Sequence, residues 1–162
     1  MDPLYPISFT LNGREVSHEI STRTTLADLL RHQIGLTATH VGCEQGSCGA
    51  CSLMVDGRMI RSCLVFAIQL DGATVETADG FDNDATMNAL REAFAARNAL
   101  QCGFCTSGML VAARDLLNRD PAPSRASIRE FISGNFCRCT GYEAIVDAIS
   151  QVSRTVATRR GA

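Results

Sequence analysis

Eight cysteines dominate this chain of 162 residues, and they fall into two groups of four separated by a long cysteine-free stretch. The first group is Cys43, Cys48, Cys51 and Cys63, and the second is Cys102, Cys105, Cys137 and Cys139. A chain of this length can build a hydrophobic core without disulfides. Its start has no basic segment followed by an apolar stretch, so we expect a cytoplasmic protein, where clustered cysteines are more often metal ligands. The sequence therefore predicts two metal sites in two domains.

Composition excludes several classes of function. The net charge is -2 and no basic stretch is present, so nucleic acid is not expected as a partner. The fifteen basic residues are all arginine, which excludes a Schiff-base lysine and a phosphate-binding loop that ends in Gly-Lys-Ser/Thr. The longest apolar runs are far shorter than the roughly 18 residues of a membrane span. The three histidines, at positions 18, 32 and 40, lack metal-ligand spacing, and we assign none to catalysis.

The first half of the chain reads as a mixed sheet with one helix. Asn12-Gly13 and Asp56-Gly57 are two-residue hairpin turns, which predict strand pairs at 7–11 with 15–20 and at 52–55 with 58–63. Apolar residues at helical spacing predict a three-turn helix that a threonine at 24 or 25 caps and Gly35 ends. A further short strand is expected at 74–77.

The second half reads as four helices. Turn-forming residues at 70–83 predict the linker, and helical periodicity follows from about residue 83. We expect Ser124 to cap the third helix and Gly134 to end it. Thr140 and Glu143 match a capping box, which predicts that the fourth helix begins immediately after Cys139.

The spacing of the first cysteine group indicates an iron-sulfur centre. Cys43-x4-Cys48-x2-Cys51, with a fourth cysteine at Cys63, is the pattern with which plant-type ferredoxins hold a 2Fe-2S cluster. Glycines at 42, 46 and 49 suit a loop whose backbone N–H groups approach sulfur atoms closely. A structural zinc site or a set of buried free thiols is the alternative.

The second group is less diagnostic, because Cys102-x2-Cys105 and Cys137-x-Cys139 would also suit zinc. The position of two of these cysteines at expected helix starts favours a redox role over a structural zinc site. Cys105 lies at the start of the second helix and Cys139 directly before the expected start of the fourth, and helix N-termini favour negative charge. We therefore expect a second cluster, with a higher reduction potential than the first.

Three segments carry a resemblance to a known family: CEQGSCGAC at 43–51, QCGFCTSG at 101–108 and GNFCRCTGY at 134–142. In this order they resemble the small iron-sulfur subunit of molybdenum hydroxylases, the xanthine oxidase family. The resemblance implies an α+β fold, with a β-grasp 2Fe-2S ferredoxin-like domain at 1–80 and an all-α four-helix 2Fe-2S-binding domain at 81–162. All eight cysteines would then bind two 2Fe-2S clusters. Ser107 departs from the family's usual proline, and we expect this to affect local rigidity only.

The same resemblance implies an electron-transfer function. Electrons would pass from a molybdopterin cofactor in a large subunit, through the helical-domain cluster and then the ferredoxin-domain cluster, to FAD in a medium subunit. The complex would be a heterotrimer or a dimer of heterotrimers. Cys139 would approach the pterin while binding iron, and the Gln101 amide would hydrogen-bond the pterin, the alternative being that it caps a turn.

The chain itself is not expected to convert substrate. It has no flavin-dinucleotide fingerprint and is too short to hold a molybdopterin domain as well, so those cofactors would come from partner subunits. Two other functions are alternatives: a zinc-stabilised interaction module, and a free-standing ferredoxin that serves several enzymes.

Overall fold

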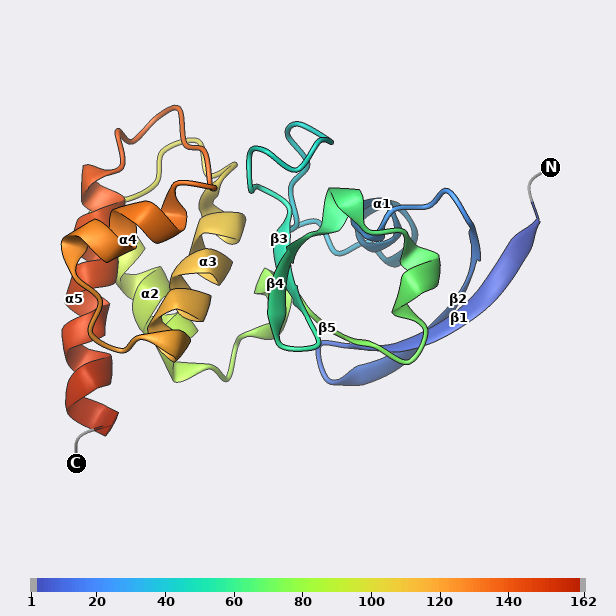
Figure 1. The fold of residues 1–162 in the computed structure, drawn as a ribbon, viewed down its shortest axis with the longest axis horizontal. Helices are drawn as coiled ribbons and strands as arrows, with labels where there is room; N and C mark the ends of the chain where they lie inside the picture. Colours follow the sequence, from blue (N-terminus) through green and yellow to red (C-terminus); the bar gives the residue numbers. More distant parts are fainter. Residues whose placement is uncertain (1–2, 161–162) are drawn as a thin grey trace.

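The computed structural model describes residues 3–160, with side chains described as far as residue 158. A mixed sheet and a group of helices lie side by side, and the strands β3 and β4 face the helix α3 (Figure 1). The cysteine-carrying loops of both parts lie at one end of the molecule, at the top of this view. The chain is therefore α+β, as the sequence predicts.

The sheet has five strands in the order β2-β1-β5-β3-β4. Their bounds are β1 Leu4–Leu11, β2 Arg14–Ser21, β3 Ser52–Val55, β4 Arg58–Arg61 and β5 Thr74–Glu76. β1 and β5 pair in parallel and the other neighbours are antiparallel, which is the β-grasp arrangement. Both predicted hairpins are confirmed, although β4 ends at Arg61 and the last two residues expected in it, Ser62 and Cys63, lie in a 3-10 turn. The two residues of each turn have positive φ, as the type of turn that matches the twist of paired strands requires.

The helix predicted to follow the first hairpin differs in type. Thr25 caps it by accepting a hydrogen bond from the Asp28 N–H, and Gly35 ends it with a φ of 85°. Only α1, Leu26–Asp28, is α-helical, and Leu29–Ile34 is a π-helix. Apolar spacing identifies the buried face of a helix, but it does not separate an α-helical from a π-helical turn.

The short strand expected at 74–77 is confirmed as β5, which is central in the sheet, so the segment expected to be the linker, residues 70–83, is not a linker over residues 74–76. The connection to the helices begins beyond it. Thr77 is held to the sheet by two hydrogen bonds with the Asn12 side chain, whereas the Ala78 carbonyl accepts one from Arg91 of the first long helix. This change of partners supports a domain boundary near residue 80, which we propose.

Four longer helices form the rest of the described chain: α2 Ala85–Ala96, α3 Thr106–Arg119, α4 Arg125–Ile132 and α5 Glu143–Arg160. Ser124 caps α4, as predicted, by accepting a hydrogen bond from the Ser127 N–H. α4 already ends at Ile132, two residues before Gly134. No described helix combines the length and the apolar character needed to cross a membrane.

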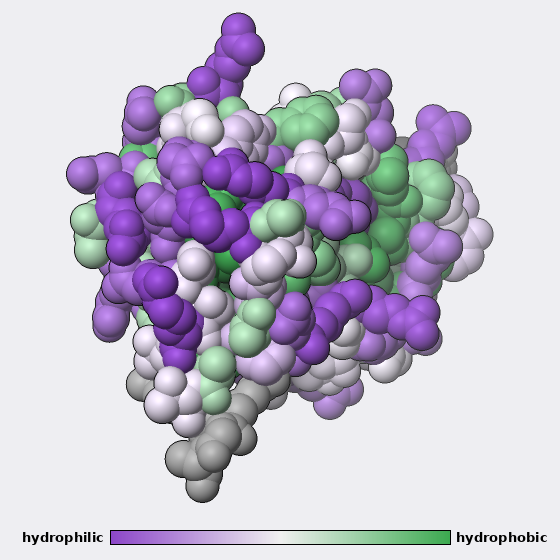
Figure 2. Space-filling view, turned by 60° about the vertical axis from the view of Figure 1, so that its left-hand side comes forward, coloured by the Kyte–Doolittle hydropathy of each residue, from purple (hydrophilic) through white to green (hydrophobic). Residues whose placement is uncertain are grey.

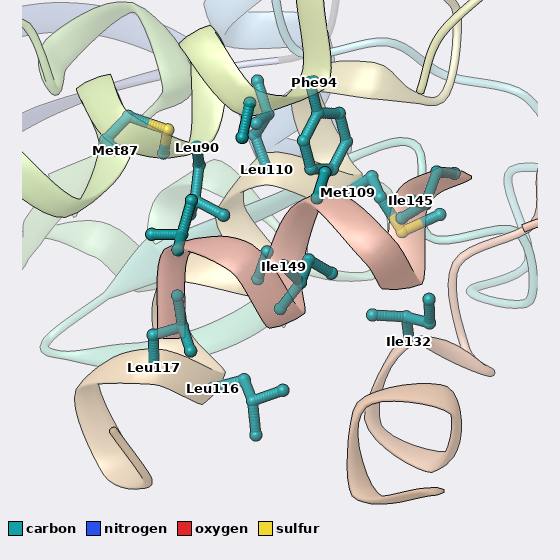
Figure 3. Packing of buried hydrophobic residues seen from close by; sticks show 14 of the residues in the cluster. Met87, Leu90, Phe94, Met109, Leu110, Leu116, Leu117, Ile132, Ile145 and Ile149 are labelled. Carbon is teal, nitrogen blue, oxygen red and sulfur yellow. The ribbon is translucent and has the colours of Figure 1, made fainter. Parts of the chain in front are cut away.

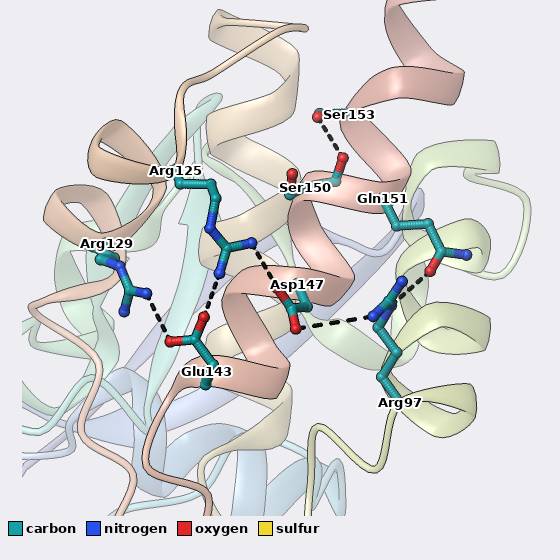
Figure 4. A network of polar contacts seen from close by, with 8 residues as sticks. All are labelled: Arg97, Arg125, Arg129, Glu143, Asp147, Ser150, Gln151 and Ser153. Atoms are coloured by element: carbon teal, nitrogen blue, oxygen red, sulfur yellow. Dashed lines mark hydrogen bonds and ion pairs between the residues drawn. The ribbon is translucent and has the colours of Figure 1, made fainter.

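The predicted capping box of α5 is wrong. Gly141 and Tyr142 both have positive φ, so the chain bends there and the helix begins only at Glu143. The Glu143 carboxylate instead pairs with Arg125 and Arg129 of α4, and Asp147 pairs with Arg125 and Arg97 (Figure 4). These pairs tie α4 and the end of α2 to α5.

Two hydrophobic cores share one strand. In β3, Leu53 packs with the residues of the sheet and α1, while Met54 packs with the core of the helices, because successive side chains of a strand point to opposite faces. Figure 3 shows the helical core, in which Met109, Leu117 and Ile149 are fully buried. The β3 strand therefore lies between the two hydrophobic cores and contributes side chains to both.

Candidate iron-sulfur sites

The four cysteines of the first group come together although Cys63 lies outside their loop. Cys43, Cys48 and Cys51 lie in the loop that leads into β3, and Cys63 lies in the 3-10 turn after β4. Their thiols meet in pairs: Cys43 contacts Cys48, and Cys51 contacts Cys63. Cys51 and Cys63 are buried, whereas the other two are half-buried.

Backbone N–H groups of the first loop point at a sulfur atom. The N–H groups of Gln45, Ser47 and Cys48 hydrogen-bond Cys43 and lower the pKa of its thiol to about 6. Burial has the opposite effect on Cys63, whose pKa it raises to about 11. Such a nest of donors favours a bound anion, and a thiolate is the form of cysteine that binds metal.

Two of the three glycines expected to shape this loop, Gly46 and Gly49, have positive φ and leave no room for a side chain. Gly46 has a φ of 81°, and a Cβ there would lie 2.5 Å from the Leu64 side chain. Gly49 has a φ of 74°, and a Cβ there would lie 2.4 Å from the Gly134 carbonyl oxygen. Larger residues would therefore push the loop away from both neighbours.

The second cysteine group also meets in pairs. The Cys139 and Cys102 sulfurs lie 3.6 Å apart at the surface, and Cys105 forms a side-chain hydrogen bond with Cys137. Burial raises the pKa of Cys105 to about 12. Burial also acts to raise the pKa of Cys137, but hydrogen bonds from Thr140, the Cys139 backbone and Cys105 together outweigh it, and the pKa is lowered. The second group therefore gathers four thiols at one site.

One of the two helix N-termini expected at this site is present. Cys105 is the N-cap residue of α3, as predicted. Cys139, however, lies four residues before Glu143, where α5 begins, so it does not adjoin a helix start. Of the two helix dipoles expected to raise the reduction potential of this cluster, only that of α3 is present beside the cysteines.

Gln101 lies beside the second group. Its side-chain Nε2 donates a hydrogen bond to the Cys139 carbonyl at 2.9 Å, which ties the Cys102 loop to the Cys139 loop. The side chain is exposed, and its amide oxygen and second N–H are not used in this bond. Its role toward a pterin stays a prediction.

A polar junction that sequence reasoning missed joins the two cysteine groups. The Phe136 N–H donates to the Cys48 carbonyl at 2.7 Å, one residue before Cys137. Beside this bond, the buried Asn135 side chain donates to the Gly49 carbonyl at 3.0 Å. Arg61 donates to the Gly134 carbonyl at 2.8 Å. The cysteine loops are thereby fixed against each other.

His40 adds a contact between the same two parts. Its ring stacks on Phe104 with centroids 4.8 Å apart, and its Nδ1 lies 2.8 Å from the Phe104 carbonyl oxygen. Phe104 stands between Cys102 and Cys105, so this histidine, which lacks metal-ligand spacing, supports the second cysteine group from the first domain.

Each group fits a two-iron cluster by its donors. Four thiols in two contacting pairs provide two ligands for each of two irons, the number that a 2Fe-2S cluster takes from four cysteines. Within residues 3–160, no three or more Cys, His, Asp or Glu side chains are arranged around one metal-ion position.

Comparison with known proteins identifies both domains. Residues 9–81 match the 2Fe-2S iron-sulfur cluster binding domain, and residues 77–150 match the [2Fe-2S] binding domain. The gamma subunit of caffeine dehydrogenase from Pseudomonas sp. (strain CBB1) is 47% identical, over 92% of this chain and 91% of the relative. The small subunit of nicotine 6-hydroxylase from Paenarthrobacter nicotinovorans is 43% identical, over 96% and 93% respectively.

Solved structures show the same relationship. A chain of quinoline 2-oxidoreductase from Pseudomonas putida 86 superposes with a TM-score of 0.91, at 49% identity and 99% coverage of both chains. The aldehyde oxidoreductase of Desulfovibrio gigas gives 0.86 at 36% identity, and there this chain corresponds to 17% of the longer protein. The chain belongs to the family of small iron-sulfur subunits of molybdenum hydroxylases, and it is the electron-transfer subunit of such an oxidoreductase.

Proposed function

We propose that all eight cysteines bind iron, two to each iron atom. The pairs are Cys43 with Cys48, Cys51 with Cys63, Cys102 with Cys139, and Cys105 with Cys137. The contacts within these pairs support the assignment, because each iron of a 2Fe-2S cluster takes two cysteine ligands. Each cluster, once bound, takes up and gives up one electron.

The observation that carries the electron-transfer function is the short connection between the two groups. From the Cys48 carbonyl, one hydrogen bond of 2.7 Å leads to the Phe136 amide, and Phe136 is bonded to Cys137. A ligand of each group is thus linked through covalent bonds and a single hydrogen bond. This supports electron exchange between two clusters within the chain.

We further propose that each cysteine group faces its own partner subunit. Leu64 and Phe66, beside Cys63, are 57% and 49% exposed, and Phe104 and Phe136, beside the second group, are 47% and 55% exposed. In contrast, the face that α4 and α5 present in Figure 2 is largely hydrophilic. Exposed apolar side chains of this size are typical of docking sites for other proteins.

The proposed assembly places the large molybdopterin subunit against Phe104 and Phe136, and the medium FAD subunit against Leu64 and Phe66. Cys139 and Gln101 are exposed at the first of these faces and would lie toward the pterin. We propose a heterotrimer or a dimer of heterotrimers in the cytoplasm, where a reducing environment keeps free thiols available for iron.

Two cysteine variants of the whole complex test this order of transfer. In Cys48→Ser, substrate should still reduce molybdenum and the helical-domain cluster, but FAD reduction should collapse. In Cys102→Ser, both the remaining cluster and FAD should stay oxidised on the turnover timescale. Rapid-mixing absorbance and EPR on assembled complexes measure both, and Ser47→Ala, an exposed neighbour in the first loop, is the control. Rapid FAD reduction in either cysteine variant would contradict the linear order.

The names of the relatives suggest which substrates to screen first. Caffeine, nicotine and quinoline are N-heterocyclic compounds, and they appear in the names of three proteins that are 43% to 49% identical to this chain. We therefore propose an N-heteroaromatic compound as substrate of the complex. Activity screening of the complex against such compounds and against aldehydes tests this, and turnover of aldehydes alone would contradict it.

A further inference from the structure

The Thr140 hydroxyl lies against one of the proposed iron ligands. Its Oγ1 donates a hydrogen bond to the Cys137 sulfur at 3.1 Å, and it accepts one from the Tyr142 N–H at 3.2 Å. Because the amide already donates to the oxygen, the single hydroxyl hydrogen is free for the sulfur. Both Thr140 and Cys137 are half-buried, so the bond is partly shielded from water.

The surrounding turn holds this hydroxyl in place. Tyr142 has a φ of 68°, which turns its N–H back toward Thr140, and its phenol oxygen accepts a hydrogen bond from the Cys137 N–H at 2.8 Å. The Tyr142 side chain also packs against the helical core. The three residues therefore form a closed set of hydrogen bonds, and this explains why Thr140 does not cap α5.

A hydrogen bond to a ligand sulfur strengthens when the sulfur gains negative charge. Reduction adds one electron to a cluster, so a donor of this kind stabilises the reduced state more than the oxidised state. Cys43 receives its donors from the backbone, which a substitution does not remove. Cys137 receives one from a side chain, which a substitution can remove.

We propose that Thr140 is a positioning residue that raises the reduction potential of the helical-domain cluster through its bond to Cys137. The proposal rests on the proposed function, because it requires a cluster at Cys102, Cys105, Cys137 and Cys139. It adds a residue that sets how readily this cluster accepts an electron in the chain of transfer.

The test is an EPR redox titration of the assembled complex, with Thr140→Val as the variant that keeps the shape and loses the donor. We expect the equilibrium constant for reduction of the helical-domain cluster to fall about tenfold, which is a shift of about 59 mV for one electron. Thr140→Ser keeps the hydroxyl and should restore the wild-type potential. The ferredoxin-domain cluster is the internal reference and should not shift.

Equal shifts in the valine and serine variants would overturn the proposal, because packing and not the hydroxyl would then be responsible. An unchanged potential in Thr140→Val would overturn it as well. If the valine variant does not retain its cluster, Thr140→Ala replaces it, with the same expectation. Failure of the proposed function is recognised separately, since wild-type complex would then lack a second iron-sulfur EPR signal before any variant is made.

Discussion

Gly108→Ala is the substitution that most directly probes how the two domains pack. Gly108 is the third residue of α3, and a Cβ there would lie 2.3 Å from the Gly49 carbonyl oxygen and 3.0 Å from that of Ala50. Ordinary contacts of this type begin at 3.4 Å. Helix α3 and the first cysteine loop would therefore have to separate by roughly 1 Å.

Two opposing effects decide whether Gly108→Ala raises or lowers the free energy of unfolding. Alanine in place of glycine within a helix stabilises it by about 1 kcal/mol. Overpacking costs about 1 to 3 kcal/mol, and here the displaced atom is a carbonyl oxygen that also accepts hydrogen bonds from Ser52 and Asn135. Because that oxygen cannot move without loss of these bonds, we expect a net loss of about 1 to 2 kcal/mol in the free energy of unfolding.

Denaturant unfolding of the iron-loaded chain measures this loss. Thr155→Ala, at an exposed position of α5, is the matched control and should be neutral or slightly stabilising. The magnetic interaction between the two reduced clusters should also weaken in Gly108→Ala, since the loops move apart. A variant as stable as wild type, with an unchanged magnetic interaction, would refute the packing argument.

Two further predictions concern single side chains. The Ser107 hydroxyl is buried and has no hydrogen-bond partner among the described residues, and Ser107 lies in the first turn of α3, where proline fits. Ser107→Pro should therefore raise the free energy of unfolding by about 0.5 to 1 kcal/mol, measured by thermal unfolding. A lower stability would contradict this. Burial acts to raise the pKa of Asp84, but the Met87 N–H and Arg114 outweigh it and lower the pKa below 3.8. The contribution of ionised Asp84 to stability is therefore complete at pH values above the ordinary aspartate pKa, and it declines as the pH falls through the lower folded-state pKa. Asp84→Asn should remove this part of the acid sensitivity in denaturant unfolding followed from about pH 5 down to about pH 2, and an unchanged pH profile would contradict it.

Local signals in the sequence predicted much of the fold. The hairpin turns at Asn12-Gly13 and Asp56-Gly57 succeeded because each is decided by two adjacent residues that accept positive φ. The Thr140 and Glu143 pattern failed for a physical reason. The threonine hydroxyl is bonded to a cysteine sulfur and the glutamate to two arginines, and neither competitor is visible in a four-residue motif.

The junction between the sites could not be predicted because its partners are distant in sequence. Arg61 bonds to a carbonyl 73 residues away, and Asn135 bonds to one 86 residues away. Both residues are ordinary polar side chains outside any metal-ligand pattern. Only the folded chain shows that they hold the Cys48 and Cys137 loops together.

Iron and acid-labile sulfide analysis of the native protein tests the central claim most directly. Two tetrads of cysteines that each hold a 2Fe-2S cluster require four irons and four sulfides per chain. We expect that ratio, together with two EPR signals in the reduced protein. Zinc at either site, or two irons in fully loaded protein, would contradict it.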